Sequence, residues 1–247
     1  MLKLVKYDLR RNRDKIWGAL VVLLLVQSGI WISAEVSDWD REAMFIMNIA
    51  SYTIGGVVLL VQACITYDYN LKSYHRRLLP LKSVYTVLSP LLTYLFMLLG
   101  VIALAALHLG LYMLLDSRGI PEDFGSVAAA GLIQLLWSAC FVMLILMLSI
   151  TIARSLRFRA GVWIGIATFI VVQNGFAWLE LALFGSSINS LDSAFQIKLT
   201  GKVPTSDGGM AVAFQDLFKI GPMLFEAGFA AVMLYVITVL VKRRVES

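Results

Sequence analysis

Apolar residues dominate six stretches of the sequence, and charged residues are concentrated between these stretches. The hydrocarbon core of a bilayer is about 30 Å thick, so a helical span needs about 17–25 mostly apolar residues. Because lipid offers no partners to backbone N–H and C=O groups, runs of this length predict helices. The pattern therefore predicts an all-α, six-helix transmembrane bundle. The predicted spans are Ile16–Ile32, Ala43–Thr66, Val84–Leu115, Val127–Ala153, Ala160–Leu183 and Met223–Val241.

Loops that are rich in basic residues alternate along the chain with loops that are poor in them. Lys and Arg in short loops resist translocation, so the loops that are rich in them stay in the cytoplasm. Sixteen of the 21 basic residues fall on one side: Lys3, Lys6, Arg10, Arg11, Arg13, Lys15, Lys72, Arg76, Arg77, Lys82, Arg154, Arg157, Arg159, Lys242, Arg243 and Arg244. The distribution predicts a multi-pass protein of the cell membrane with both termini in the cytoplasm.

The composition leaves no room for a separate soluble domain. Hydrophobic residues make up 60% of the chain and charged residues 15%, and the mean hydropathy is +0.81. We expect a cytoplasmic helix over residues 1–15, a transmembrane domain over 16–241 and a basic tail over 242–247. An extracellular segment is expected at 185–222. The net charge of +5 sits in juxtamembrane loops, where the orientation rule accounts for it, so it does not indicate a nucleic-acid partner.

The first 15 residues are amphipathic at the helical period. The apolar positions Leu2, Val5 and Leu9 share one face, and the basic positions Lys3, Lys6, Arg10 and Arg13 share another. A helix of this kind lies in the headgroup layer, with its apolar side toward the hydrocarbon and its cations toward anionic lipid. A plain basic tail that only sets orientation is the alternative.

A second amphipathic segment, residues 67–80, separates spans two and three. Its apolar stripe comprises Tyr67, Leu71, Tyr74 and Leu78, and the turns between hold Lys72, His75, Arg76 and Arg77. Asp68 or Asn70 can cap its start, and Pro80 ends it because the residue before proline is disfavoured in the α region. The segment predicts a short cytoplasmic helix that docks on a partner protein or on headgroups. A solvated basic turn is the alternative.

These features together resemble the permease subunits of type 2 (drug, peptide and lipid) ATP-binding-cassette exporters. The resemblance rests on six spans with both ends inside, the basic N-terminal helix, and the run Leu78-Leu79-Pro80-Leu81 before span three. It implies two separate ATPase subunits, a second identical or similar permease, and a coupling helix that sits on the ATPase. The ATPase-coupling residues would be Asp68, Leu71, Tyr74, Arg76, Arg77, Leu78, Leu79 and Pro80.

The chain has no visible chemistry of its own. It lacks the P-loop pattern G-x-x-x-x-G-K-[ST], and its Gly201-Lys202 pair is followed by Val203. ATP and Mg²⁺ would therefore be bound by the partner ATPase, and we expect no cofactor or metal in this chain. His75 and His108 form no His-Glu cluster, so an enzymatic role is disfavoured.

Polar residues inside the spans are the candidates to face substrate: Gln173, Asn174, Glu180 and Glu226. Both glutamates lie near predicted span ends, where they can reach the interface without a function or line an outward-facing cavity. The Gln173-Asn174-Gly175 run can loosen its helix. Gln27, Gln62 and His108 are expected to hydrogen-bond between helices, and the Gly55-Gly56 pair to permit close helix approach.

The sequence thus predicts a permease that moves hydrophobic or amphipathic peptides, drugs or lipids by alternating access, powered by a separate ATPase. A membrane sensor or immunity protein that does not transport, and that acts through partner binding, is the alternative.

Overall fold

The computed structural model describes residues 2–37, 39, 41–72, 83–115, 124–155, 161–184 and 220–245. Within these ranges the chain is almost entirely helical and contains no strand. The helices are α1 (Leu2–Arg11), α2 (Arg13–Val36), α3 (Arg41–Lys72), α5 (Ser83–Leu115), α6 (Phe124–Ser155), α7 (Gly161–Phe184) and α9 (Ile220–Leu240), and α9 continues into the π-helical turn η1 (Val241–Val245). All but α1 and η1 are long and apolar enough to cross a bilayer. The prediction of an all-α multi-pass membrane protein with six long apolar helices is confirmed.

The predicted break between span two and the segment that follows it is absent. Helix α3 runs without interruption to Lys72, so residues 67–72 extend span two instead of beginning a new helix. The Lys72 ammonium lies 2.8 Å from the Asp68 carboxylate one turn earlier, a pairing that supports the helix at this point. Asp68 therefore lies within the last turns of α3 and does not cap a helix start. Residues 73–80 lie outside the described residues.

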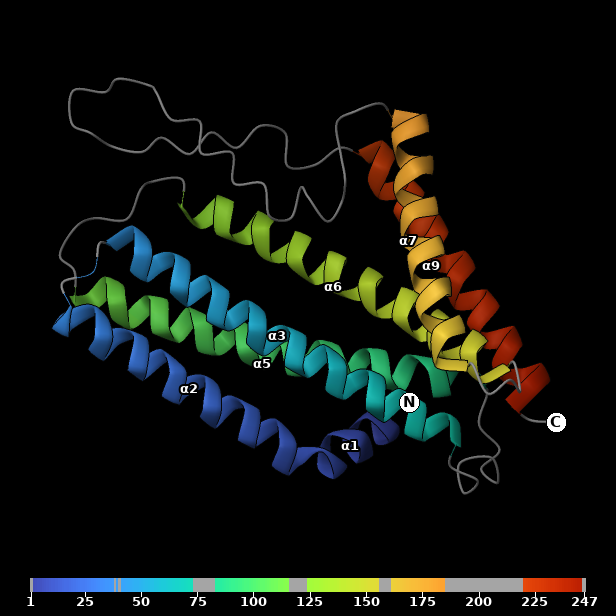
Figure 1. The fold of residues 1–247 in the computed structure, drawn as a ribbon, viewed down its shortest axis with the longest axis horizontal. Coiled ribbons are helices and arrows are strands. Elements are labelled where there is room, and N and C mark those ends of the chain that lie inside the picture. Colours follow the sequence, from blue (N-terminus) through green and yellow to red (C-terminus); the bar gives the residue numbers. More distant parts are fainter. Residues whose placement is uncertain are drawn as a thin grey trace. The chain divides into compact units, whose positions relative to one another are not determined.

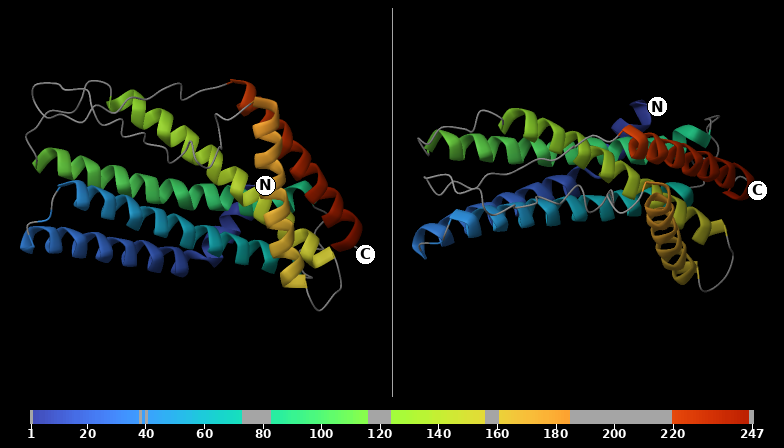
Figure 2. Two further views of the ribbon diagram at one scale, coloured as in Figure 1. Left: turned by 45° about the horizontal axis from the view of Figure 1, so that its top comes forward. Right: turned by 90° about the horizontal axis from the view of Figure 1, so that it is seen from above.

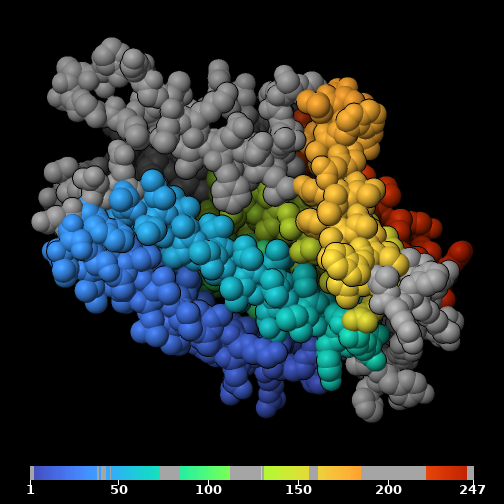
Figure 3. Space-filling view, viewed as in Figure 1, coloured from blue at the N-terminus to red at the C-terminus, as the bar shows by residue number. Residues whose placement is uncertain are grey.

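The chain divides into two compact units. The N-terminal unit holds α1, α2, α3 and α5, and the C-terminal unit holds α6, α7 and α9. In the N-terminal unit, α2 packs along α3 and α3 packs along α5, while α1 lies against α5 and the start of α2 (Figure 1, Figure 2). The side chains of α2 and α3 form a continuous surface along this unit (Figure 3).

Small and polar residues hold the three spans of the N-terminal unit together. A Cβ atom added at Gly55 would lie 3.1 Å from Leu23 Cδ1 of α2, so the predicted close approach at the Gly55-Gly56 pair is confirmed. Gln27 of α2 donates a hydrogen bond to Ser51 of α3. The Tyr52 hydroxyl of α3 hydrogen-bonds to His108 Nδ1 of α5 at 3.1 Å. The interhelical roles expected of Gln27 and His108 are therefore confirmed.

The C-terminal unit contains a close contact between α6 and α7 that the sequence reasoning missed. A Cβ atom added at Gly165 would lie 3.3 Å from Ala153 Cβ of α6, and one added at Gly161 would lie 3.2 Å from the Ala153 carbonyl oxygen. Gly161 and Gly165 form a Gly-x-x-x-Gly pattern, which is typical of close helix contacts in membranes. The spacing was visible in the sequence and was the signal that could have found this contact.

The Gly165 contact yields the first prediction. Gly165→Ala is expected to destabilise the chain by about 1 kcal/mol, because overpacking costs about 1–3 kcal/mol and the better helix propensity of alanine offsets only about 1 kcal/mol. Gly175→Ala on the same helix is the matched control, since nothing lies within 4 Å of its added methyl group. Thermal unfolding of the detergent-purified chain measures both. Equal melting temperatures for the two variants would contradict the prediction.

Candidate functional site

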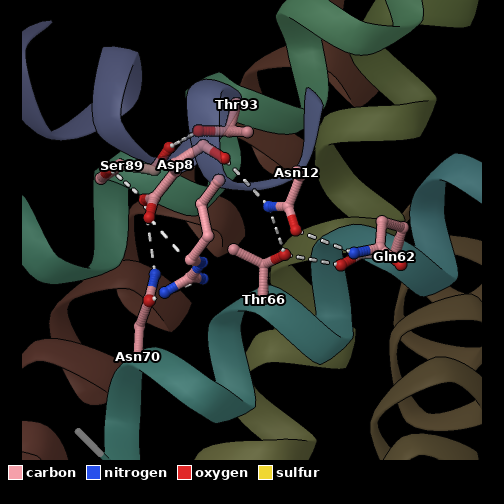
Figure 4. Close-up of polar contacts among 8 residues, drawn as sticks. Asp8, Asn12, Gln62, Thr66, Asn70, Ser89 and Thr93 are labelled. Atoms are coloured by element: carbon pink, nitrogen blue, oxygen red, sulfur yellow. Dashed lines mark hydrogen bonds and ion pairs between the residues drawn. The ribbon is translucent and has the colours of Figure 1, made fainter. Parts of the chain in front are cut away.

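A buried polar network joins α1 to α3 and α5 at one end of the N-terminal unit (Figure 4). Its centre is Asp8, which is 0% exposed. Asp8 Oδ2 accepts hydrogen bonds from Ser89 Oγ of α5 at 2.9 Å and from Asn70 Nδ2 of α3 at 3.4 Å. Arg11 Nη2 lies 3.8 Å from Asp8 Oδ1. A buried carboxylate is stable only when hydrogen-bond donors surround it. The network therefore holds α1 in this position.

Asn12 is the second anchor of α1. Its Nδ2 donates to the Asp8 carbonyl oxygen and to Thr66 Oγ1, each at 3.0 Å. Its Oδ1 accepts from Gln62 Nε2 at 3.0 Å, so the interhelical role expected of Gln62 is confirmed. Asn12 also separates α1 from α2, and the single helix expected over residues 1–15 is therefore interrupted at this residue. We call Asp8, Asn12, Gln62, Thr66, Asn70 and Ser89 the N-terminal clamp.

Helix α3 supplies its part of the clamp from one face. Gln62, Thr66 and Asn70 are four residues apart and so line one side of the helix. Asn70 was expected to cap a new helix, but its Oδ1 accepts from Arg11 Nη2 at 3.1 Å instead. The four-residue polar spacing at the end of a span, together with Asp8 on the apolar side of a basic helix, was the signal that could have revealed the clamp.

The clamp changes the interpretation of α1. The predicted amphipathic helix forms, but on its apolar face Val5 is buried against protein and Leu9 is half-buried. Asp8 lies on the same side of the helix as these residues. The expected insertion of Val5 into lipid is therefore wrong, because the neighbouring Asp8 carboxylate needs hydrogen-bond donors that hydrocarbon lacks.

Two residues of the proposed docking stripe are buried within the chain itself. Tyr67 is 0% exposed and Leu71 is 5% exposed. The expectation that they offer an open surface to a partner is wrong, since neighbouring parts of the chain already cover them. The remaining coupling residues, Tyr74, Arg76, Arg77, Leu78, Leu79 and Pro80, lie outside the described residues. The coupling role of the whole segment stays a prediction.

A cluster of phenylalanine rings, which we call the aromatic core, joins the helices of the C-terminal unit. The centroid of Phe176 on α7 lies 4.7 Å from that of Phe141 on α6. It lies 5.5 Å from Phe225 and 5.0 Å from Phe229, both on α9. Aromatic pairs at these separations contribute about 0.5–1.5 kcal/mol each beyond the area they bury. This aromatic core therefore joins all three helices of the unit.

Two carboxylates are buried beside the aromatic core. Glu180 lies one turn after Phe176 on α7 and is 2% exposed, and Glu226 directly follows Phe225 on α9 and is 5% exposed. Glu226 Oε2 accepts a hydrogen bond from the Trp137 indole N–H of α6. Both side chains are therefore covered by the chain itself, and whether they face substrate stays a prediction. Sequence reasoning did not single out Trp137, because nothing in its own span marks it as a donor to α9.

The amide pair on α7 is arranged differently. Asn174 is exposed and its Nδ2 donates to the Ile170 carbonyl oxygen of its own helix at 2.7 Å, whereas Gln173 is half-buried. Asn174 is about 200° around the helix from Phe176, so it lies away from the aromatic core. Helix α7 is continuous through Gly175, and the expected loosening is absent. Of the four residues predicted to face substrate, Glu180 and Glu226 are buried beside the aromatic core, and Gln173 and Asn174 are not.

In the part of the chain that the structure describes, no three His, Cys, Asp or Glu side chains are grouped so that they could hold a metal ion. Cys64 and Cys140 are free thiols.

The clamp yields the second prediction. Asp8→Ala is expected to destabilise the chain by about 1–3 kcal/mol, because it leaves buried donors on Asn70 and Ser89 without their acceptor. Asp8→Asn retains an acceptor and is expected to lose less. Asp14→Ala is the control, since the Asp14 side chain is 93% exposed. Thermal unfolding in detergent and limited proteolysis of the N-terminal segment measure the effect, and an Asp8→Ala variant as stable as Asp14→Ala would show that the clamp does not stabilise the unit.

No family model, curated protein or solved structure matches this chain.

Proposed function

We propose that this chain is the permease subunit of an ATP-driven exporter of the cell membrane, with both termini in the cytoplasm and its ATPase on a separate polypeptide. Six apolar helices supply the membrane-spanning part. The type 2 exporter resemblance supplies the expectation of two ATPase subunits and a second, identical or similar permease. Substrates of apolar character, such as hydrophobic peptides, drugs or lipids, fit spans that carry few charges.

The N-terminal clamp is the observation that carries this proposal. Asn70 lies two residues before the end of α3, and Ser89 lies in the second turn of α5. Asp8 binds both of them, so α1 ties together the two helices that flank the 73–82 connection. A push delivered at that connection would move α1, α3 and α5 as one body, which is the mechanical property that a coupling segment requires.

The mechanism follows from that linkage. ATP binding closes the two ATPases, which push on residues 68–80. Helices α3 and α5 then tilt together, and α1 carries the movement to α2 through Asn12. The pair of permeases thereby changes the side of the membrane to which its substrate path is open. No bond in the substrate is made or broken.

The buried carboxylates give this path a chemical preference. Glu180 and Glu226 lie beside a phenylalanine core, and a cationic group is attracted both to a carboxylate and to the faces of aromatic rings. Intramembrane carboxylates are costly to bury and are functional hypotheses by default. We therefore assign them to recognition of the cationic end of an amphipathic substrate.

The coupling role yields the third prediction. Affinity purification of the chain from its native membrane should recover a P-loop ATPase, and Tyr74→Ser/Leu78→Ser should abolish that recovery by removing the apolar anchors. Ile32→Ser/Val36→Ser is the matched control. These two apolar residues are also four positions apart, and both are exposed at the C-terminal end of α2. Mass spectrometry identifies the partner. Purification of the wild-type chain without any such ATPase would instead favour a sensor or immunity protein.

The carboxylates yield the fourth prediction. In vesicles containing the permease with its ATPase, Glu226→Gln is expected to reduce ATP-dependent transport of a cationic amphiphile at least about tenfold, the loss expected when about 1.4 kcal/mol of ion pairing is removed. Transport of a neutral amphiphile of similar size should be unchanged, because glutamine can still accept the Trp137 hydrogen bond. The same substitution at the exposed Glu35 is the control. Equal losses for both amphiphiles would remove the charge-recognition role.

A further inference from the structure

The face of α1 opposite the clamp is basic. Successive residues of an α-helix are rotated by about 100°, which places Lys3, Lys6, Tyr7 and Arg10 together in a sector about 100° wide. All four side chains are exposed, and Tyr7 is 59% exposed. We call these four residues the basic face. It lies across the helix from Val5 and Asp8.

No acidic group neutralises the basic face within the described part of the chain. Lys3, Lys6 and Arg10 make no ion pair there. The only acidic residue of α1 is Asp8, which is buried on the other side of the helix. The clamp thus buries the negative charge of Asp8, whereas the positive charges of Lys3, Lys6 and Arg10 remain at the surface. These surface charges favour an anionic partner.

The contacts of α1 place this face at the level where the spans end. Asp8 of α1 contacts Asn70, and Asn12, which directly follows α1, contacts Gln62 and Thr66, so the C-terminal end of α1 lies beside the last three turns of α3. Helix α1 packs mainly against α5 and is linked to α3 through Asp8, so the basic face on its opposite side points away from both helices. Trp17, in the second turn of α2, is 61% exposed, as expected of an aromatic residue at the membrane interface.

We propose that the basic face binds the headgroups of anionic phospholipids and that the clamp holds it in the orientation to do so. Attachment is electrostatic, since the apolar side of α1 is already covered by protein. A lipid is favoured over a soluble acidic protein because only Asn12 separates α1 from a membrane span, which keeps the face at the bilayer surface. Tyr7 adds an amphipathic ring suited to the headgroup layer. This inference does not depend on the transport proposal.

Lipid binding by the full chain tests the inference. The detergent-purified protein is titrated with phosphatidylglycerol or phosphatidylcholine in mixed micelles, and bound lipid is counted by native mass spectrometry. Lys6→Gln/Arg10→Gln is expected to weaken phosphatidylglycerol binding about 25-fold, because each basic residue near an anionic surface contributes about fivefold. Lys242→Gln/Arg243→Gln is the matched control, since it removes two exposed charges from the other unit and should retain full binding. Raised salt should weaken binding by the wild-type chain.

Three results would overturn the inference. They are full phosphatidylglycerol binding by Lys6→Gln/Arg10→Gln, an equal loss in the control variant, and phosphatidylcholine binding as tight as that of phosphatidylglycerol. Competition with millimolar glycerol phosphate separates a lipid from a free anion: retained lipid binding supports the lipid surface, and full displacement shows a soluble-phosphate site instead. Size-exclusion profiles of both variants establish that they remain folded, as expected for substitutions at exposed positions.

Discussion

The N-terminal unit depends on one requirement, which is that the buried carboxylate of Asp8 must be surrounded by hydrogen-bond donors. Those donors come from α3, from α5 and from Arg11 of α1 itself. The positions of these donors determine where α1 lies and which of its sides is covered. One acidic side chain thus links the ends of α1, α3 and α5, and both the proposed coupling and the proposed lipid surface are argued from that linkage.

The C-terminal unit meets the same requirement in a different setting. Glu226 receives an indole N–H beside a core of phenylalanine rings, whereas Asp8 is held by hydroxyl, amide and guanidinium groups. The first environment is apolar and aromatic, and the second is a polar network. Because of this contrast, we assign a structural role to Asp8 and propose a recognition role only for the carboxylates beside the aromatic core.

The spans could be predicted closely because each depends on the transfer of its own residues into lipid. Helix α7, for example, runs over Gly161–Phe184 where Ala160–Leu183 was expected. The break expected at residue 67 was wrong because an amphipathic pattern and a potential cap do not interrupt a helix whose backbone hydrogen bonds can simply continue. The Gly161-x-x-x-Gly165 contact was readable from spacing, but its partner Ala153 was not.

The sequence by itself determined the helical class, the six spans, the lack of a P-loop and the amphipathic character of residues 2–11, since composition and short-range periodicity set all of these. Only the tertiary structure decided which face of α1 is covered, that Asn70 binds Arg11 and Asp8, and that Glu180 and Glu226 are buried. The physical reason is distance along the chain. Asp8 and Ser89 are 81 positions apart, and the hydrogen bond between them exists only once separate helices have packed.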